Sequence, residues 1–243
     1  MCLYRVTLHL AQPLPQRSGY ALYAWLLARC PAGAAQQIHA AQLSPVCQYL
    51  DGLLWHITLC GTACAEALLP LLQTVTAVQL HCMPHPTAVL HREVQCITPE
   101  ALLEQPPAPV LQLDLRSPTA FKSGGCYQLL PTPRLVLQSQ ITRWNATFGE
   151  VYPIPTDDPA LLDALADGLM YRQLSLQSVD YRLKRQQIPG VVGSLQAHHR
   201  AEGLHLTLAN ALLMQANWTG MGIKTALGMG GVQVCPSGAA KPQ

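Results

Sequence analysis

One lysine and five glycines near the carboxyl end have the residue types and spacing of an anion-binding loop. The glycines form two clusters on either side of the lysine, and the six residues are Gly220, Gly222, Lys224, Gly228, Gly230 and Gly231. Glycine readily adopts positive φ and lets a backbone come close to a partner. Backbone N–H groups that turn outward in such a loop form a concave site for an anion. The pattern therefore indicates anion binding, although a tight turn in any α+β protein has a similar composition.

Other well-known chemical motifs do not occur. The loop lacks Gly-x4-Gly-Lys-Ser/Thr, and it follows a helical pattern rather than the strand that a dinucleotide fingerprint needs. Gly-x-Ser-x-Gly, the serine hydrolase motif, is missing too. The run His81-x3-His85-x5-His91 has metal-ligand residue types. Prolines at positions 84 and 86, within a strand pattern, argue against a preformed metal site, so we expect neither a metal nor another cofactor.

Composition narrows the class of protein. Charged residues make up 12% of the 243 residues, and the net charge is +2. Nucleic-acid binding would therefore rest on a few placed cations and on shape, because no broad basic footprint exists. Nine scattered cysteines, mostly in apolar settings such as Cys47, Cys60 and Cys96, indicate buried thiols in a reducing cytoplasm. We expect no signal peptide and no membrane span.

The elements that would position the loop fall into two units. In the first unit, alternating apolar residues predict strands near 3–10, 53–59, 75–82 and 87–96. Helical periodicity predicts helices near 19–30 and 62–73, and we expect residues 37–50 to be extended and then looped. This β-α-β-β-α-β order is typical of ferredoxin-like or RRM-like domains.

The second unit repeats this kind of order. Its predicted elements are a strand at 110–115, helices at 133–147 and from Asp158-Pro159 to 171, strands at 174–183 and 191–198, a helix at 204–216 and a last strand at 232–234. Residues 105–109 are dense in proline, so we place the domain boundary there, with domains 1–105 and 106–243. The predicted fold class is α+β, with two tandem ferredoxin-like domains and antiparallel sheets.

Three blocks within residues 110–234 resemble a known family. The glycine doublet with Lys224-Thr225 between its halves resembles the glycine-rich loop of the RAMP superfamily of CRISPR-associated proteins. Residues 121–136, with 140–145, resemble the central block of the CRISPR repeat-processing endoribonucleases, and 189–194 resembles the strand before their last helix. The resemblance implies a metal-independent endoribonuclease whose partner is CRISPR repeat RNA, with other effector subunits as further partners. The low share of charged residues implies apolar surface, which favours a homodimer.

The resemblance also implies a set of catalytic residues. In the family a ribose 2′-hydroxyl attacks the adjacent phosphate and leaves a 2′,3′-cyclic phosphate. His39 is the first candidate for proton transfer, because Ile38-His39-Ala40-Ala41 resembles the place of the family's active-site histidine. Tyr23 and Tyr20 are candidates for the tyrosine that the first helix often supplies. Either tyrosine could equally be helix packing, and His39 could be an ordinary half-buried histidine.

The cation of the site is left open. The position at which the family often has a lysine is Ser44 in this sequence. Arg17, Arg29 and Lys224 are the candidates to stabilise the phosphorane. If none of them reaches the phosphate, the chain would bind RNA and cut it slowly, or only bind it. The alternative function is a non-catalytic RAMP subunit that binds guide RNA.

Further cations are candidates for RNA contacts. Within the matched blocks they are Lys122, Arg134, Arg143 and Lys224, and outside them Lys184 and Arg185. The last two residues lie between two predicted strands, where a basic hairpin could follow the phosphates of an RNA stem. A solvated hairpin tip has the same sequence pattern.

Overall fold

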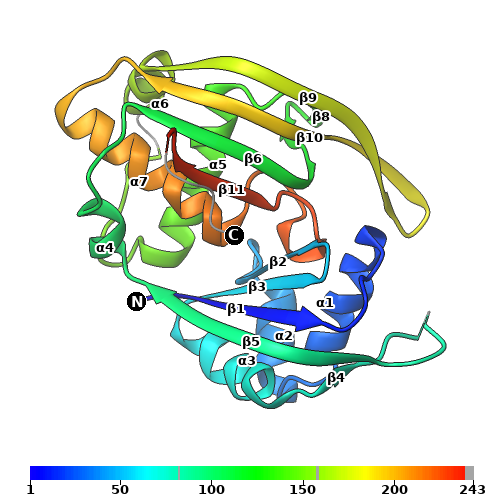
Figure 1. Cartoon of the computed structure of the whole chain (residues 1–243). Coiled ribbons are helices and arrows are strands. Elements are labelled where there is room, and N and C mark those ends of the chain that lie inside the picture. The colour runs from blue at the N-terminus through cyan, green and yellow to red at the C-terminus, as the bar shows by residue number, and fades with distance from the viewer. Residues whose placement is uncertain (82, 157–158, 239–243) are drawn as a thin grey trace.

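The computed structural model describes residues 1–81, 83–156 and 159–238. Two antiparallel sheets lie in separate halves of the chain, each with helices against one face (Figure 1). Each half has its own apolar core, one built around Leu22, Trp55 and Leu68 and the other around Trp144, Phe148 and Leu212. The predicted α+β class with two ferredoxin-like sheets is confirmed, while the boundary near residue 105 stays a prediction.

The first sheet has the strand order β2-β3-β1-β5-β4. Its strands are β1 (Leu3–Leu10), β2 (Val46–Asp51), β3 (Leu54–Cys60), β4 (Ala77–Val78) and β5 (Thr87–Ile97). The helices that cover one face are α1 (Gly19–Leu27), α2 (Ala32–Ala40) and α3 (Thr62–Thr74), and a short 3-10 turn, η1 (Gln16–Ser18), precedes them (Figure 1). Alternate β1 side chains such as Val6, Leu8 and Leu10 are buried beneath the helices. This strand was predicted correctly because such burial produces alternating apolar residues in the sequence.

Three expectations for this half need correction. Residues 37–40, expected to be extended, belong to helix α2: α1 already ends at Leu27, Pro31 is the N-cap residue of α2, and the alanines after it favour a helix. The strand expected at 75–82 is only β4, Ala77–Val78, and Cys82 lies outside the described residues. Cys96 is exposed on β5, although Cys47 is buried as expected and all cysteines in the described part of the chain are free thiols.

The second sheet has the order β11-β6-β10-β9. Its strands are β6 (Val110–Thr119), β9 (Leu169–Leu183), β10 (Gln186–His199) and β11 (Val232–Pro236). Helices α5 (Pro133–Phe148) and α7 (Gly203–Thr219) pack on one face, α6 (Pro159–Asp167) packs beside them, and α4 (Pro99–Leu103) connects the halves (Figure 1). Helix α6 ends earlier than expected, since the chain enters β9 directly after Gly168; Asp158 lies outside the described residues.

A small hairpin adds to this half. Strands β7 (Phe121–Ser123) and β8 (Cys126–Gln128) pair across Gly124 and Gly125, both at positive φ. This hairpin was not predicted from the sequence, although Gly-Gly between two short runs is a hairpin signal.

The two halves are joined by α7 and by the glycine-rich segment that follows it. Helix α7 contacts β1, β2 and β3 of the first sheet as well as β11 of the second. The 3-10 turn η2 (Thr225–Leu227) packs on β2 and α1. Buried Gln48 on β2 donates to the carbonyl oxygens of Gly19, at 2.7 Å, and Ala226, at 2.8 Å. This side chain therefore fixes the glycine-rich segment against the first helix.

Candidate active site

A hollow of about 600 Å³ opens where α1, α2, the β7–β8 hairpin and the glycine-rich segment meet. Its polar and charged lining residues are Tyr20, Tyr23, His39, Gln42, Ser44, Lys122, Tyr127, Arg143, Lys224 and Thr225. Segments far apart in the sequence thus bring an imidazole, phenol groups and cations to one place. None of the described residues that line the hollow is acidic, so the groups around it are neutral or cationic.

His39 lies in the last turn of α2, and its side chain is exposed at the hollow. The helix is anchored to the core by Ile38, its single buried residue. Because neighbours on a helix point about 100° apart, burying Ile38 directs His39 to a different side. The helix thus presents an imidazole with open access to solvent, as a group that exchanges protons with a ligand requires.

Tyr23 and Tyr20 come from α1. The Tyr23 hydroxyl lies 3.5 Å from Oγ of Ser44, which in turn accepts from the backbone N–H of Val46 at 3.2 Å. This contact connects α1 to the segment between α2 and β2. Tyr20 lies at the edge, where the ammonium of Lys184 is 4.4 Å from its ring centroid. A cation at this distance interacts favourably with the ring face, so the tip of the β9–β10 hairpin borders the hollow.

The glycine-rich segment closes another side of the hollow, chiefly through Lys224. This residue has φ of 57°, an uncommon backbone conformation for a side chain with a Cβ, and it is exposed. The N–H groups of Gly220, Gly222 and Gly230 donate to Ala216 O, Ser139 Oγ and Pro118 O. These three N–H groups therefore bond within the protein rather than turning outward.

Close packing explains the glycines better than anion binding does. Gly222 has φ of 79°, and a Cβ there would lie 2.1 Å from the carbonyl oxygen of Ala120. Gly228 approaches α1, where a Cβ would lie 3.1 Å from Cα of Gly19. The segment needs bare backbone in order to fit between β6 and α1, and this fit sets the place of Lys224.

Arg143 on α5 forms the buried floor of the hollow, with 5% of its surface exposed. Nη1 donates to the carbonyl oxygen of Ser44 at 3.1 Å and to Sγ of Cys47 at 3.3 Å, and Nη2 donates to Oγ1 of Thr225. One guanidinium thus binds three segments that line or support the hollow. Hydrogen bonds from the Cys60 thiol, and then the charge of Arg143, lower the pKa of the Cys47 thiol.

Comparison with known proteins identifies the family. The family model described as CRISPR-associated endoribonuclease Cas6 matches residues 113–232. A Cas6 from Mycobacterium tuberculosis is 26% identical over 226 residues, which cover 88% of this chain and 71% of the relative. The chain belongs to the Cas6 family of CRISPR-associated endoribonucleases. A Cas6 from Streptococcus thermophilus is 25% identical over 220 residues, with 87% of this chain and 89% of the relative covered.

The Cas6 assignment also holds at the level of the fold. A solved Cas6 product complex superposes on the chain with a TM-score of 0.80 at 25% identity, and the match covers 97% of this chain and 100% of the solved one. The match to the family model spans the hairpin, α5 and the glycine-rich segment. It begins at residue 113 and so leaves out the N-terminal half, which supplies His39, Tyr20 and Tyr23 to the hollow.

The structure brings together some of the predicted residues of this Cas6 family member. His39, Tyr23, Tyr20, Lys122, Arg143, Gly222 and Lys224 all line the hollow. Gly220, Gly228 and Gly230 belong to the same segment but lie buried behind it. The assembly of these residues is observed, whereas their roles stay proposals.

Other predicted cations lie elsewhere. Arg29 stacks on Trp25, 4.1 Å from its ring centroid, and donates to the carbonyl oxygen of the same residue. Arg134 forms an exposed ion pair with Asp163 on α6. Arg17 lines a separate hollow beside β9. Arg185 is exposed in the β9–β10 turn, next to Lys184.

Sequence reasoning missed Tyr127 as a lining residue. It pairs across the hairpin with Lys122, so both side chains lie on the same face of that ribbon. The hairpin signal at Gly124-Gly125, had it been followed, would have paired Tyr127 with the predicted RNA-binding lysine.

Proposed function

We propose that this Cas6 family endoribonuclease cuts CRISPR precursor RNA within its repeats by attack of a ribose 2′-hydroxyl on the adjacent phosphate. The P–O bond to the 5′-oxygen of the next nucleotide breaks as the new P–O bond forms. The products are a 2′,3′-cyclic phosphate and a free 5′-hydroxyl. No water and no other reactant enters, and the proton lost by the 2′-oxygen is balanced by the one that the 5′-oxygen gains.

His39 is our candidate for one of the two proton transfers. An imidazole serves as base or acid near neutral pH because its ordinary pKa is about 6.5. The supporting observation is that His39 is exposed and lines the same hollow as three cations and three phenols. Tyr23, whose hydroxyl lies in that hollow near Ser44, is the candidate to orient the ribose or to take part in the second transfer.

Lys122 and Lys224 are the candidates to stabilise the phosphorane. The family's usual lysine position is Ser44 here, but both of these exposed lysines line the hollow. Cations directed at a developing oxyanion stabilise a transition state more than the ground state. Arg143 is already engaged by three partners within the protein, so we assign it a positioning role.

Metal independence is part of the proposal. Nucleases that hold catalytic metal ions do so with clustered oxygen ligands, usually carboxylates. The described lining of the hollow has no Asp or Glu, which favours acid–base chemistry by side chains.

RNA binding would then rest on few cations. Lys122 and Lys224 in the hollow, with Lys184 and Arg185 at the hairpin beside it, form a short basic path next to Tyr20 and Tyr127. The aromatic rings could stack on unpaired bases. A homodimer and assembly with other CRISPR effector subunits stay predictions, and in the described residues no helix is long and apolar enough to cross a membrane.

The experiment is cleavage of a repeat RNA in the presence of EDTA, beside the same RNA with 2′-deoxyribose at the scissile nucleotide. We expect cleavage of the first substrate and none of the second, together with a cyclic phosphate end on the upstream product. Cleavage of the deoxy substrate, or dependence on added Mg²⁺, would rule out the mechanism. Tight binding of both RNAs with no product after long incubation would instead select the alternative, a non-catalytic RNA-binding subunit.

A further inference from the structure

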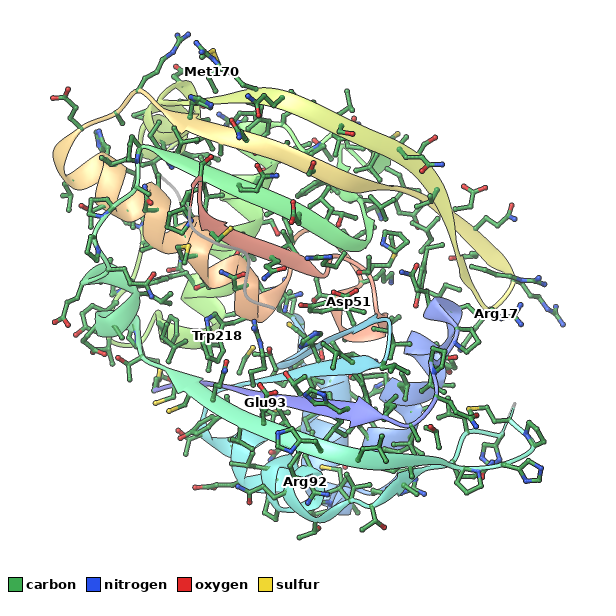
Figure 2. All side chains as sticks on the ribbon, in the orientation of Figure 1. Arg17, Asp51, Arg92, Glu93, Met170 and Trp218 are labelled. Atoms are coloured by element: carbon green, nitrogen blue, oxygen red, sulfur yellow. The ribbon has the colours of Figure 1, made fainter. Side chains whose placement is uncertain are left out.

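Three metal-ligating side chains gather on the face of the first sheet that is turned away from its helices. His9 on β1 and His91 on β5 are directly paired in the antiparallel register. Glu93 lies two residues further along β5, and residues two apart on a strand share a face. Figure 2 shows Glu93 and its neighbour Arg92 on opposite sides of β5. Arg92 bonds to the end of α3, so the cluster lies on the other face.

The three side chains are already close to one another. Nε2 of His9 lies 2.9 Å from Oε1 of Glu93. The rings of His9 and His91 meet edge to face, with centroids 5.1 Å apart. One ligand atom from each of the three residues lies within 4.8 Å of the others.

We propose that His9, His91 and Glu93 bind a divalent transition-metal cation of the Zn²⁺ class. With metal–ligand bonds of about 2.0–2.2 Å, tetrahedral ligands of zinc lie about 3.3 Å apart. The pair of His9 and Glu93 is near that spacing, and His91, which has a ligand atom within 4.8 Å of both, would have to move closer on binding. His91 and Glu93 are exposed and His9 is half-buried, so nothing packed in the core has to move.

The donor set selects the kind of ion. Two imidazoles and one carboxylate suit Zn²⁺ and its neighbours in the first transition row, whereas Mg²⁺ and Ca²⁺ prefer sites made of oxygen ligands. Three protein ligands leave a fourth position for water or for a side chain of another molecule.

The simpler alternative is an ion pair between His9 and Glu93 with no metal. That pair accounts for the contact of 2.9 Å, but it gives no role to His91, whose ring packs against the same imidazole. In the sequence, His91 forms a run with His81 and His85, for which we expected no metal. The register with β1 gives it other partners, from a strand more than 80 residues away in the sequence.

The ion would act as a link between strands. A metal held by one residue of β1 and two of β5 ties the central strand to its neighbour, and it stabilises the folded chain because the unfolded chain lacks the site. None of the three ligands lines the candidate active site. The proposed metal site is therefore independent of the proposed RNA cleavage.

The test is a calorimetric titration of ZnCl2 into tag-free full-length chain that has been freed of metal with EDTA and exchanged into chelator-free buffer. Thermal unfolding with and without zinc provides a second readout. The variants are His91→Asn and Glu93→Gln, and the matched control is His205→Asn, an exposed histidine on α7 outside the cluster.

We expect a single equivalent of zinc to bind to the wild type and to the control and to raise their unfolding temperature. Loss of a ligand should weaken binding by at least about tenfold, the lower range seen even for residues that only support ligands. Absence of zinc binding to the wild type would overturn the proposal and leave the ion pair. Equal affinity in His91→Asn would also overturn it, since the ion would then sit elsewhere, for example on thiols.

Discussion

Arg143 Nη1 lies 3.1 Å from the carbonyl oxygen of Ser44, and this contact joins α5 of the second half to the segment that follows the His39 helix. The same guanidinium reaches Thr225 in the glycine-rich segment. The relative placement of His39 and Lys224 therefore depends on one buried cation beneath them.

Replacing Arg143 with methionine should destabilise the fold and disturb the site. The change removes this donor from the partly buried Ser44 carbonyl and from the buried Thr225 hydroxyl, which keeps its contact with Cys47, and a group left unsatisfied costs about 1–3 kcal/mol. Urea unfolding measures the loss of stability, and single-turnover cleavage measures the loss of rate. Arg134→Gln is the control, because its ion pair with Asp163 is exposed and contributes at most about 1 kcal/mol. Equal effects of the two variants would remove the special role of Arg143.

Gly222→Ala should be more damaging than Gly124→Ala. Both glycines have positive φ, but a Cβ at Gly222 would lie 2.1 Å from the Ala120 oxygen, while Gly124 has nothing within 4 Å. The control therefore carries only the conformational strain of about 1–2 kcal/mol. The free energy of unfolding of each variant, with its cleavage rate, gives the comparison. Similar destabilisation by both would mean that the segment can shift to make room.

Lys122→Gln and Lys224→Gln should weaken RNA binding and lower its salt dependence. Each phosphate contact that is lost reduces the slope of log K against log salt by about 0.7–0.9. Binding of an uncleavable repeat RNA at several salt concentrations measures the slope. Arg200→Gln, an exposed cation outside the lining of the hollow, should leave the slope unchanged. A slope identical to that of the wild type in both lysine variants would place the RNA elsewhere.

Acid should destabilise the chain through His56. Burial, and then the charges of Arg5, His9 and Arg116, lower the pKa of His56 to about 3. In the unfolded chain its pKa is about 6.5. Below that pH the unfolded state binds more protons than the folded state, so the free energy of unfolding decreases as the pH is lowered. Each pH unit below about 6.5 removes about 1.4 kcal/mol from the free energy of unfolding. At pH 5 the contribution of His56 is therefore a loss of about 2 kcal/mol relative to neutral pH.

The measurement is urea unfolding of the wild type and of His56→Gln at pH 7.5 and pH 5. The variant lacks the titrating ring, so its stability should fall less between the two values. The comparison is made within each protein, because the substitution also removes the stacking of His56 on Tyr49. A fall in the variant as large as in the wild type would assign the acid sensitivity to other groups, such as His199, whose pKa burial also lowers, to about 4.

Periodicity predicted most of the fold because alternate burial in β1 and β6 and helical spacing in α5 are strong signals. It failed at α2, whose stability comes from packing Ile38 rather than from an apolar stripe. It also failed at β4, which is only two residues long.

The candidate site was predictable in part, and chiefly by resemblance. His39 and Lys224 lie in segments that resemble the family, Tyr23 was a candidate for the tyrosine of the family's first helix, and the fold brings the three together. Two features could not be predicted from the sequence: Arg143 is buried, and Arg29 stacks on Trp25 instead of lining the hollow. Both depend on contacts that form only on folding. The same holds for His9, His91 and Glu93, which meet through strand register.

The most direct test of the central claim is single-turnover cleavage of a repeat RNA by wild type and by His39→Ala, with RNA affinity measured in parallel. If the imidazole transfers a proton, the rate should fall by about 10²–10⁴ while affinity stays within a few fold. His205→Ala serves as the matched control and should keep the wild-type rate. An unchanged rate in His39→Ala would contradict the account, and a loss of affinity equal to the loss of rate would make His39 a binding residue instead.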